Sequence, residues 1–203
     1  MSNAWWKSAE DHIEEISFSG IQNDLYRAKA RYEHDLSRIK EKYGLRKLPA
    51  GVYPLWKPLR GRGRLGEFAL VVAREHYRKR GYSVWASGSD KEVKDRFILV
   101  SFPGLRKQLP LHPAYARMVR IFGSEKIEEL NRTVDKEKRK KKGHRNLGGG
   151  DPDLFVFKKG NPRKGFFVEV KYKDQPTQNQ LMCFPRIDEK LGEIKLARVE
   201  CRS

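Results

Sequence analysis

The sequence has little of what a disulfide framework or a zinc site requires. Only two cysteines are present, Cys183 and Cys201, with neither a Cys-x-x-Cys pair nor a pair of histidines at zinc-ligand spacing. Disulfide scaffolds and zinc sites both need several such residues at short intervals. Neither is indicated, so any metal has to be held by oxygen ligands.

Long apolar runs are also missing. The chain has no stretch of about 18 apolar residues, the length that a membrane-spanning helix needs. Its basic segments lack the aromatic, amphipathic pattern of an interfacial anchor, and residues 1–6 resemble neither a signal peptide nor a transit sequence. We therefore expect a cytoplasmic protein that does not associate with membranes.

Positive charge, by contrast, is abundant. The 203 residues include 44 Lys and Arg against 26 Asp and Glu, a formal net charge of +18. Such an excess destabilises a compact chain by self-repulsion, and a polyanionic partner is the simplest reason to keep it. A chain of this length has room for one full domain with one active site. We expect that domain to bind nucleic acid.

The N-terminal part predicts a helical extension and linker over residues 1–58. Between residues 21 and 43, apolar residues recur at spacings of three and four, the period of an amphipathic helix. The polar face of this helix mixes both signs of charge, which favours a solvated face over a DNA-binding one. The same helix is a candidate contact for a homodimer. Residues 45–64 contain three prolines and end in alternating arginine and glycine, which predicts a linker.

The remaining residues, 62–203, predict an α/β domain with a mixed sheet. The patterns predict helices over residues 65–80, 113–142 and 176–191, and strands over residues 82–87, 95–102, 154–157, 166–172 and 194–201. Gly123 predicts a break in the second helix, and Pro185 predicts a kink or an early end in the third. The segment 90–145 is interpreted as an insertion between the first strand and the later ones.

The strand at residues 166–172 carries the first chemical signal. Strand alternation sends Phe167, Glu169 and Lys171 to one face, so a carboxylate and an ammonium share that face. A hairpin joins this strand to the one that begins after Asp153, and a second carboxylate can therefore lie beside Glu169. The alternative is a cross-strand ion pair on a solvated sheet face.

Two carboxylates and a lysine are the groups that metal-dependent phosphodiester hydrolysis needs. Oxygen ligands hold Mg²⁺ or Mn²⁺, the metal neutralises the scissile phosphate and acidifies a water, and a nearby lysine orients or deprotonates that water. Mg²⁺ keeps several of its waters. Asp153, Glu169 and one backbone carbonyl, that of Val170, would therefore suffice as protein ligands.

Three segments together resemble the signature of the VRR-NUC family within the PD-(D/E)XK nuclease superfamily. They are Gly148-Gly149-Gly150-Asp151-Pro152-Asp153-Leu154, Phe167-Val168-Glu169-Val170-Lys171 and Asn179-Gln180. The resemblance implies an αβββαβ core like that of restriction endonucleases, and divalent-metal cleavage of DNA that leaves a 5′-phosphate. It also implies that Asp153 and Glu169 bind the metal and that Lys171 is the catalytic lysine.

The same resemblance assigns two further residues. Gln180 matches the family's glutamine on the helix that follows the metal-binding strands, and the alternative is an ordinary surface position. Glu67 matches an early acidic residue and is a candidate metal ligand, with Glu75 on the same helix as its competitor. A helix-start glutamate favoured by the helix dipole is the alternative for Glu67.

Polar residues around this constellation are candidates for DNA contacts. His144, Arg145 and Asn146 precede the glycine turn, and Lys173 follows the strand that carries Lys171. The fork of an arginine matches a phosphate well. Loop solubility is the alternative for the three residues before the turn.

Other chemically capable residues receive no catalytic role. Asp151 is interpreted as a turn-stabilising residue ranked below Asp153. His76 and His112 are interpreted as structural. For Trp5 and Trp6 two roles are left open: stacking on a base, or plugging a neighbouring molecule.

These observations predict a magnesium-dependent DNA nuclease. Phosphate contacts should dominate its affinity, and no recognition helix or finger motif indicates sequence specificity. Standalone relatives of the resembled family act on branched DNA, often as dimers, so cutting of junctions or flaps in DNA repair is the natural sub-hypothesis. The alternatives are a non-catalytic basic nucleic-acid-binding module, which metal dependence distinguishes, and cleavage of RNA by the same residues.

Overall fold

The computed structural model describes residues 2–19, 65–88, 95–100, 109–140, 150–171 and 177–202, with a few single positions between 38 and 46. Helices and strands alternate along these segments. The elements are α1 (Ser2–Glu10), β1 (Glu14–Ser19), α4 (Leu65–Lys79), β2 (Tyr82–Ser87), β3 (Arg96–Phe97), the 3-10 helix η1 (Leu109–Leu111), α5 (Pro113–Phe122), α6 (Ser124–Lys140), β4 (Leu154–Lys158), β5 (Asn161–Lys171), α7 (Gln178–Lys190) and β6 (Ile194–Arg202). Among them, no helix is long and apolar enough to cross a membrane.

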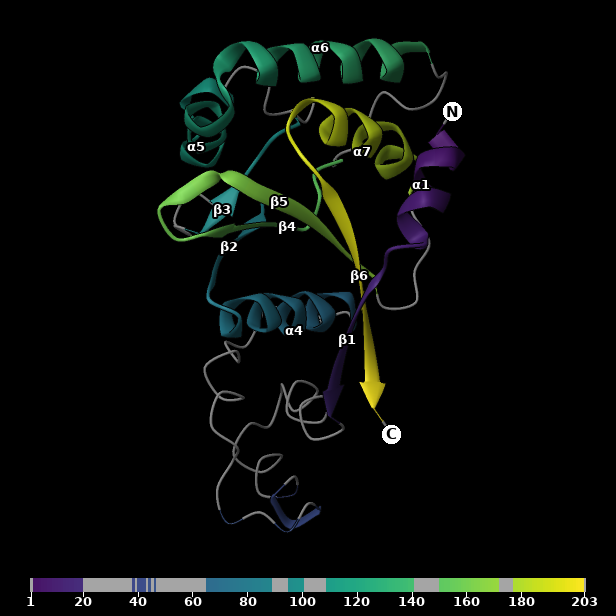
Figure 1. The fold of residues 1–203 in the computed structure, drawn as a ribbon, viewed down its shortest axis with the longest axis vertical. Coiled ribbons are helices and arrows are strands. Elements are labelled where there is room, and N and C mark those ends of the chain that lie inside the picture. Colours follow the sequence, from purple (N-terminus) through teal and green to yellow (C-terminus); the bar gives the residue numbers. More distant parts are fainter. Residues whose placement is uncertain are drawn as a thin grey trace.

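The strands form one mixed six-stranded sheet in the order β1-β6-β5-β4-β2-β3 (Figure 1). Strand β4 runs antiparallel to β2 and β5, whereas the other neighbouring pairs are parallel. From α4 onward, and without the elements of the 90–145 segment, the chain order is α4-β2-β4-β5-α7-β6. This is the expected αβββαβ order, and the α/β fold prediction is confirmed.

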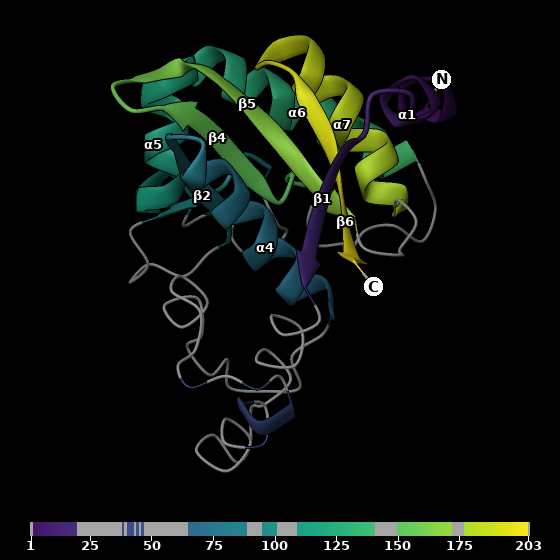
Figure 2. The same ribbon diagram turned by 60° about the horizontal axis from the view of Figure 1, so that its bottom comes forward.

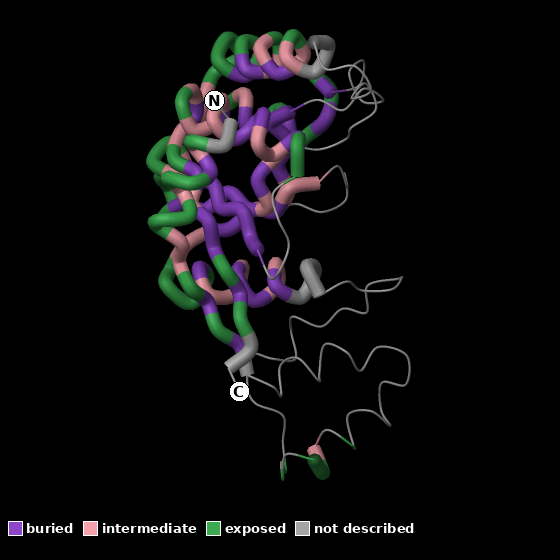
Figure 3. Tube along the Cα trace, turned by 90° about the vertical axis from the view of Figure 1, so that its right-hand side faces the viewer, coloured by how far each residue is buried: buried purple, intermediate pink, exposed green. Residues whose placement is uncertain are grey.

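Helices cover both faces of the sheet. Helix α4 lies on one face, and α5, α6, α7 and α1 lie on the other (Figures 1 and 2). Buried residues concentrate in the strands and on the helix faces toward the sheet (Figure 3). Phe167 belongs to the core on the α7 side, whereas Val168 and Val170 belong to the core on the α4 side. The alternation predicted for β5 is therefore present.

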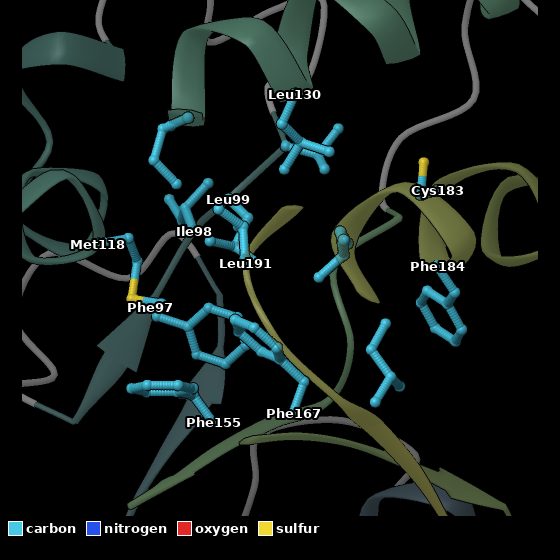
Figure 4. Packing of buried hydrophobic residues seen from close by; sticks show 14 of the residues in the cluster. Phe97, Ile98, Leu99, Met118, Leu130, Phe155, Phe167, Cys183, Phe184 and Leu191 are labelled. Atoms are coloured by element: carbon cyan, nitrogen blue, oxygen red, sulfur yellow. The ribbon is translucent and has the colours of Figure 1, made fainter. Parts of the chain in front are cut away.

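The core on the α7 side is rich in phenylalanine. The rings of Phe97, Phe155 and Phe167 lie within 5.0–6.2 Å of one another, centroid to centroid, and Met118 of α5 packs beside them (Figure 4). Phe97 and Met118 both come from the predicted insertion, 90–145. That segment therefore contributes to the main core.

Strand β1 corrects the prediction of a helical N-terminal extension. Residues 14–19 pair in parallel with β6, with Ile16 opposite Val199 and Phe18 opposite Cys201. Ile16 and Phe18 are buried in the core on the α4 side, while Glu15 and Ser17, which alternate with them, are exposed. This period-two pattern suits a strand. The predicted helix over residues 21–43 and the linker over 45–64 lie outside the described residues, apart from single positions.

Helix α7 passes through Pro185 and continues to Lys190. The early end that the proline predicted does not occur. Pro185 lacks an N–H and cannot make the usual bond to residue 181, but α7 is held by partners outside itself. Arg186 forms an ion pair with Glu137 of α6 at 2.9 Å, and Lys190 forms one with Glu129 of the same helix.

Candidate active site

Four of the predicted site residues lie at one end of the central strands. Asp153 immediately precedes β4, Glu169 and Lys171 close β5, and Gln180 lies in the first turn of α7. In the β4–β5 pairing Leu154 is opposite Val168, which brings the residue before β4 level with Glu169. The sheet register therefore places the two carboxylates on neighbouring strands.

Asp153 is fixed by the backbones of two other strands. Its carboxylate Oδ2 accepts a hydrogen bond from Val170 N at 2.9 Å, and its carbonyl accepts one from Ser87 N, at the end of β2, at 2.8 Å. The first bond attaches the Asp153 carboxylate to the peptide that follows Glu169.

Glu169, Lys171 and Gln180 form a closed set of contacts. Lys171 Nζ lies 2.9 Å from Glu169 Oε1 and donates to Gln180 Oε1 at 3.1 Å. Gln180 Nε2 donates to the same Glu169 oxygen at 2.5 Å. Each side chain touches the other two, so the position of the ammonium group depends on both partners.

Gln180 has a second role that the sequence analysis missed. Its Oε1 also accepts from Thr177 N at 2.9 Å, and its own N–H donates to Thr177 Oγ1, so that the two residues form a capping box at the start of α7. The signal was present in the sequence as Thr-x-x-Gln. The capping box fixes the glutamine on the helix, and the glutamine in turn contacts Lys171.

The Glu169–Lys171 pair is almost completely buried. Glu169 is 1% exposed and Lys171 9% exposed. An ion pair on a solvated sheet face, the alternative interpretation, does not describe these residues. Removing two charges from water carries a desolvation penalty that their mutual attraction often fails to repay, so a buried pair is weak evidence for a purely stabilising role.

The donor set suits a small, hard cation. Two carboxylates are available, and in an extended strand the N–H and C=O of one residue point to the same side. Because Val170 N points to Asp153, the Val170 carbonyl lies on the Asp153 side of β5. Among the described residues no group of three or more His, Cys, Asp or Glu side chains is placed to hold a metal. Two carboxylates and a carbonyl nevertheless match Mg²⁺, which retains several waters.

Asp151 and Gly150 hold the turn before Asp153. The Asp151 carboxylate accepts from Leu99 N at 3.2 Å and from Val100 N at 2.7 Å. Gly150 has a φ of +133°, and a Cβ there would lie 2.6 Å from the Cys183 sulfur of α7. Position 150 therefore requires glycine, both for its backbone conformation and because there is no space for a Cβ. The hydrogen bonds of Asp151 agree with the structural role predicted for that residue.

Helix α4 carries the candidate early acidic residues. A tight turn at Gly81 joins α4 to β2, so the chain reverses direction between the two elements. Glu67 lies in the first turn of α4, but its side chain is outside the described residues. Its competitor Glu75 forms an ion pair with Arg78 at 3.3 Å.

The four residues predicted to contact DNA and the histidine interpreted as structural have different outcomes. His144, Arg145, Asn146 and Lys173 lie outside the described residues. His112 caps α5 by accepting from Ala114 N at 3.2 Å, a structural role.

The two N-terminal tryptophans, Trp5 and Trp6, pack in or against the hydrophobic core. Trp6 is 7% exposed and belongs to the core, and the ring of Trp5 meets that of Phe184 edge-on at 5.8 Å. Neither stacking on a base nor plugging a neighbouring molecule fits the buried Trp6 ring.

His76 takes part in an ion-pair cluster that sequence reasoning missed. Glu14 at the start of β1 accepts from Tyr77 Oη at 2.6 Å and from His76 Nε2 at 3.0 Å, and it pairs with Arg80. We call this group the Glu14 anchor. Burial raises the pKa of Glu14, but the hydrogen bonds from Tyr77 and His76 and the charge of Arg80 together hold the pKa below its ordinary value. The anchor joins β1 to the end of α4.

A cluster of positive charge lies at the far end of the same two strands. The hairpin between β4 and β5 has no acidic residue from 154 to 168. Its exposed cations, here called the basic hairpin, are Lys158, Lys159, Arg163 and Lys164. None of them makes an ion pair with another residue that the structure describes. Lys158 is five residues from Asp153, about 17 Å along an extended strand.

The chain is similar to solved structures but matches no protein-family model. No curated protein matches it either. Among solved structures, it is similar to paFAN1 bound to DNA with a two-nucleotide 5′ flap and a gap, at a TM-score of 0.34 and 17% identity, and to paFAN1 with a one-nucleotide flap and a gap, at 0.35 and 16%. The matches cover 85% and 87% of this chain but only 42% and 45% of those chains.

Proposed function

We propose that this protein is a divalent-metal-dependent nuclease that hydrolyses phosphodiester bonds in DNA. The observation that carries the proposal is the buried Glu169–Lys171 pair, held by Gln180 and adjacent to the Asp153 carboxylate. Ionisable groups desolvated next to specific charge partners are concentrated at functional sites. The net charge of +18 supports a polyanionic substrate.

Each side chain has a defined role in this proposal. Asp153, Glu169 and the Val170 carbonyl would hold Mg²⁺ or Mn²⁺. When bound, the metal would neutralise charge on the scissile phosphate and lower the pKa of the attacking water. Lys171 would orient that water or accept its proton. The water oxygen would bond to phosphorus as the bond to the 3′ oxygen breaks. The water proton would pass to solvent, or to Lys171 in its neutral form, and the departing 3′ oxygen would take a proton from solvent, leaving a 5′-phosphate and a 3′-hydroxyl.

Gln180 and Glu67 would assist without carrying the main chemistry. Gln180 holds both Glu169 and Lys171, so it would keep the lysine at a fixed distance from the metal site. Glu67 lies in the first turn of α4, and the family resemblance of the sequence supports it as a further oxygen ligand. Arg145, His144, Asn146 and Lys173 would contact backbone phosphates near the cut.

The finer substrate preference rests on the family resemblance of the sequence. It favours branched or flapped DNA, a homodimer in solution and a cytoplasmic protein acting in DNA repair. The basic hairpin adds charge that suits phosphate contacts remote from the cut. Affinity should accordingly fall steeply with salt concentration.

The experiment is a cleavage assay on linear, 5′-flapped and four-way-junction DNA, with single-stranded RNA as a fourth substrate. Each is incubated with Mg²⁺ or Mn²⁺ and, in parallel, with EDTA. Lys171→Ala is compared with Lys136→Ala, which removes an exposed lysine from α6. We expect metal-dependent cutting that Lys171→Ala reduces about a hundredfold or more and that Lys136→Ala leaves unchanged.

The outcomes separate the competing functions. Tight, salt-dependent binding without cutting under any metal condition would favour the non-catalytic binding module. Cutting of RNA alone by the same residues would move the substrate class while retaining the site. Equal activity of the two lysine variants would remove Lys171 from the mechanism.

A further inference from the structure

The N-terminal helix lies directly beside the candidate active site. The ring of Trp6 in α1 is 5.7 Å, centroid to nitrogen, from Lys171 Nζ. Trp6 is 7% exposed and belongs to the same buried core as Cys183 and Phe184 of α7. Residues 2–19 are far in sequence from β5, which carries Lys171, yet the fold brings helix α1 against this lysine.

Several contacts fix the Trp6 ring. Its Nε1 donates to Glu10 Oε1, one turn further along α1, at 2.7 Å. The neighbouring Trp5 ring lies 6.2 Å from it and packs edge-on against Phe184. The chain then continues into β1, which is paired with β6 along its whole length. Trp6 is thus held between the sheet and α7.

We propose that Trp6, which α1 brings against the candidate site, is a positioning residue for Lys171. This inference rests on the proposed nuclease function. Three groups then surround the ammonium: a carboxylate oxygen of Glu169 at 2.9 Å, the amide oxygen of Gln180 at 3.1 Å and the Trp6 ring. They come from β5, α7 and α1.

The physical basis is the attraction of a cation to an aromatic face. The negative face of an indole attracts an ammonium ion, more strongly where water is excluded. A lysine side chain has four rotatable bonds, and ordering it costs rotamer entropy. A fixed ring on one side, together with two fixed oxygen acceptors, reduces the conformations that the amine samples before the reaction. Trp6 would therefore act on turnover through Lys171, with little effect on DNA affinity.

The test compares three variants in steady-state cleavage. Trp6→Leu removes the aromatic face, Trp6→Phe retains a ring, and Trp5→Leu removes a neighbouring indole that packs on Phe184. We expect Trp6→Leu to lower kcat about threefold to thirtyfold with KM for DNA nearly unchanged. Trp6→Phe should recover most of the loss, and Trp5→Leu should leave kcat within about twofold of the parent protein. Circular dichroism and thermal unfolding establish that each variant is folded at the assay temperature.

A second measurement does not depend on cleavage. A double-mutant cycle of unfolding combines Trp6→Leu with Lys171→Met, and a matched cycle combines Trp5→Leu with Lys171→Met. The first pair should couple by about twofold to thirtyfold in the unfolding equilibrium constant, and the second pair should not couple.

The two measurements separate failure of the inference from failure of the proposed function. If the parent protein cuts DNA but Trp6→Leu retains full kcat, or if Trp5→Leu lowers kcat as much as Trp6→Leu, the positioning role is overturned. If the parent protein cuts no nucleic acid, the nuclease function fails. The unfolding cycle then still decides whether Trp6 holds Lys171, and absence of coupling overturns that contact.

Discussion

Two aspartates that are two residues apart should respond to the same substitution in opposite ways. Asp151 accepts hydrogen bonds from the backbone of Leu99 and Val100, which are 0% and 2% exposed. Asp153 accepts one from Val170 and lies beside Glu169. We therefore expect Asp151→Asn to reduce stability while activity remains, and Asp153→Asn to abolish activity while stability remains.

The magnitudes follow from the hydrogen bonds. A bond to a charged acceptor contributes about 1.5–3 kcal/mol and one to a neutral acceptor about 0.5–1.5 kcal/mol, so neutralising the acceptor costs about 1 kcal/mol per N–H. Asp151→Asn affects two N–H groups and should cost about 2 kcal/mol, a fall in Tm of about 4–8 °C for a chain of this size. Asp153→Asn weakens only one hydrogen bond, and the loss of repulsion between residue 153 and Glu169 offsets that cost. The free energy of unfolding should therefore stay within about 1 kcal/mol of the parent value.

The assay pairs thermal unfolding with cleavage. Both variants and the parent protein are unfolded by heat under identical conditions, and cleavage in Mg²⁺ is measured about 15 °C below the lowest Tm. Loss of cleavage in Asp151→Asn with an unchanged Tm would refute the reasoning, because Asp151 would then be the functional carboxylate. Full cleavage by Asp153→Asn would refute it equally.

Three further predictions concern the rest of the fold. Gly150→Ala should reduce the free energy of unfolding in urea by about 2–4 kcal/mol, because a Cβ there meets Cys183 at 2.6 Å and φ is positive; Gly81→Ala, which meets no atom within 4 Å, should cost only about 1 kcal/mol of backbone strain. Replacing the four cations of the basic hairpin by Gln should weaken DNA binding and lower the salt slope of log Kd by about 3–4. The control replaces four exposed cations elsewhere by Gln, and it should lower the slope by less than about 1; these are Arg120, Lys126, Arg132 and Lys136. Equal effects of the two sets would contradict a specific role for the hairpin. Because the pKa of Glu14 is held low, Glu14 contributes to stability above the ordinary glutamate pKa of about 4.3, and this contribution is lost as pH falls through the lower folded-state pKa. Glu14→Gln should flatten this part of the profile of unfolding free energy against pH. An unchanged profile would show that the Glu14 anchor contributes nothing to stability.

The core elements were predictable because their signals are local. The alternation in residues 166–172 separates Phe167 from Val168, and the structure places these two residues in opposite cores. The periods and stop residues likewise predict most of the helices and strands from α4 onward, whereas the αβββαβ core was implied by the family resemblance. Strand β1 was missed since Ile16 and Phe18 give only two alternating apolar positions, and pairing with β6 is what makes them a strand.

The candidate site was only partly predictable, because some of its contacts are local and others join distant parts of the chain. Strand period and hairpin connection bring Glu169, Lys171 and Asp153 together without knowledge of the rest of the chain. The capping box that fixes Gln180 was visible as Thr-x-x-Gln. The contact of Trp6 with Lys171 was not visible, because it joins residues separated by most of the chain length.

The sequence by itself determined the α/β elements, the positive charge and the spacing of the carboxylates and lysine, because backbone periodicity and composition act over a few residues. Only the tertiary structure decided that Glu169 and Lys171 are buried, that Asp151 holds Leu99 and Val100, and that α1 lies against the site. Burial and long-range contacts depend on which elements pack on which face of the sheet. That choice is made by the summed packing of the whole chain, and no local pattern encodes it.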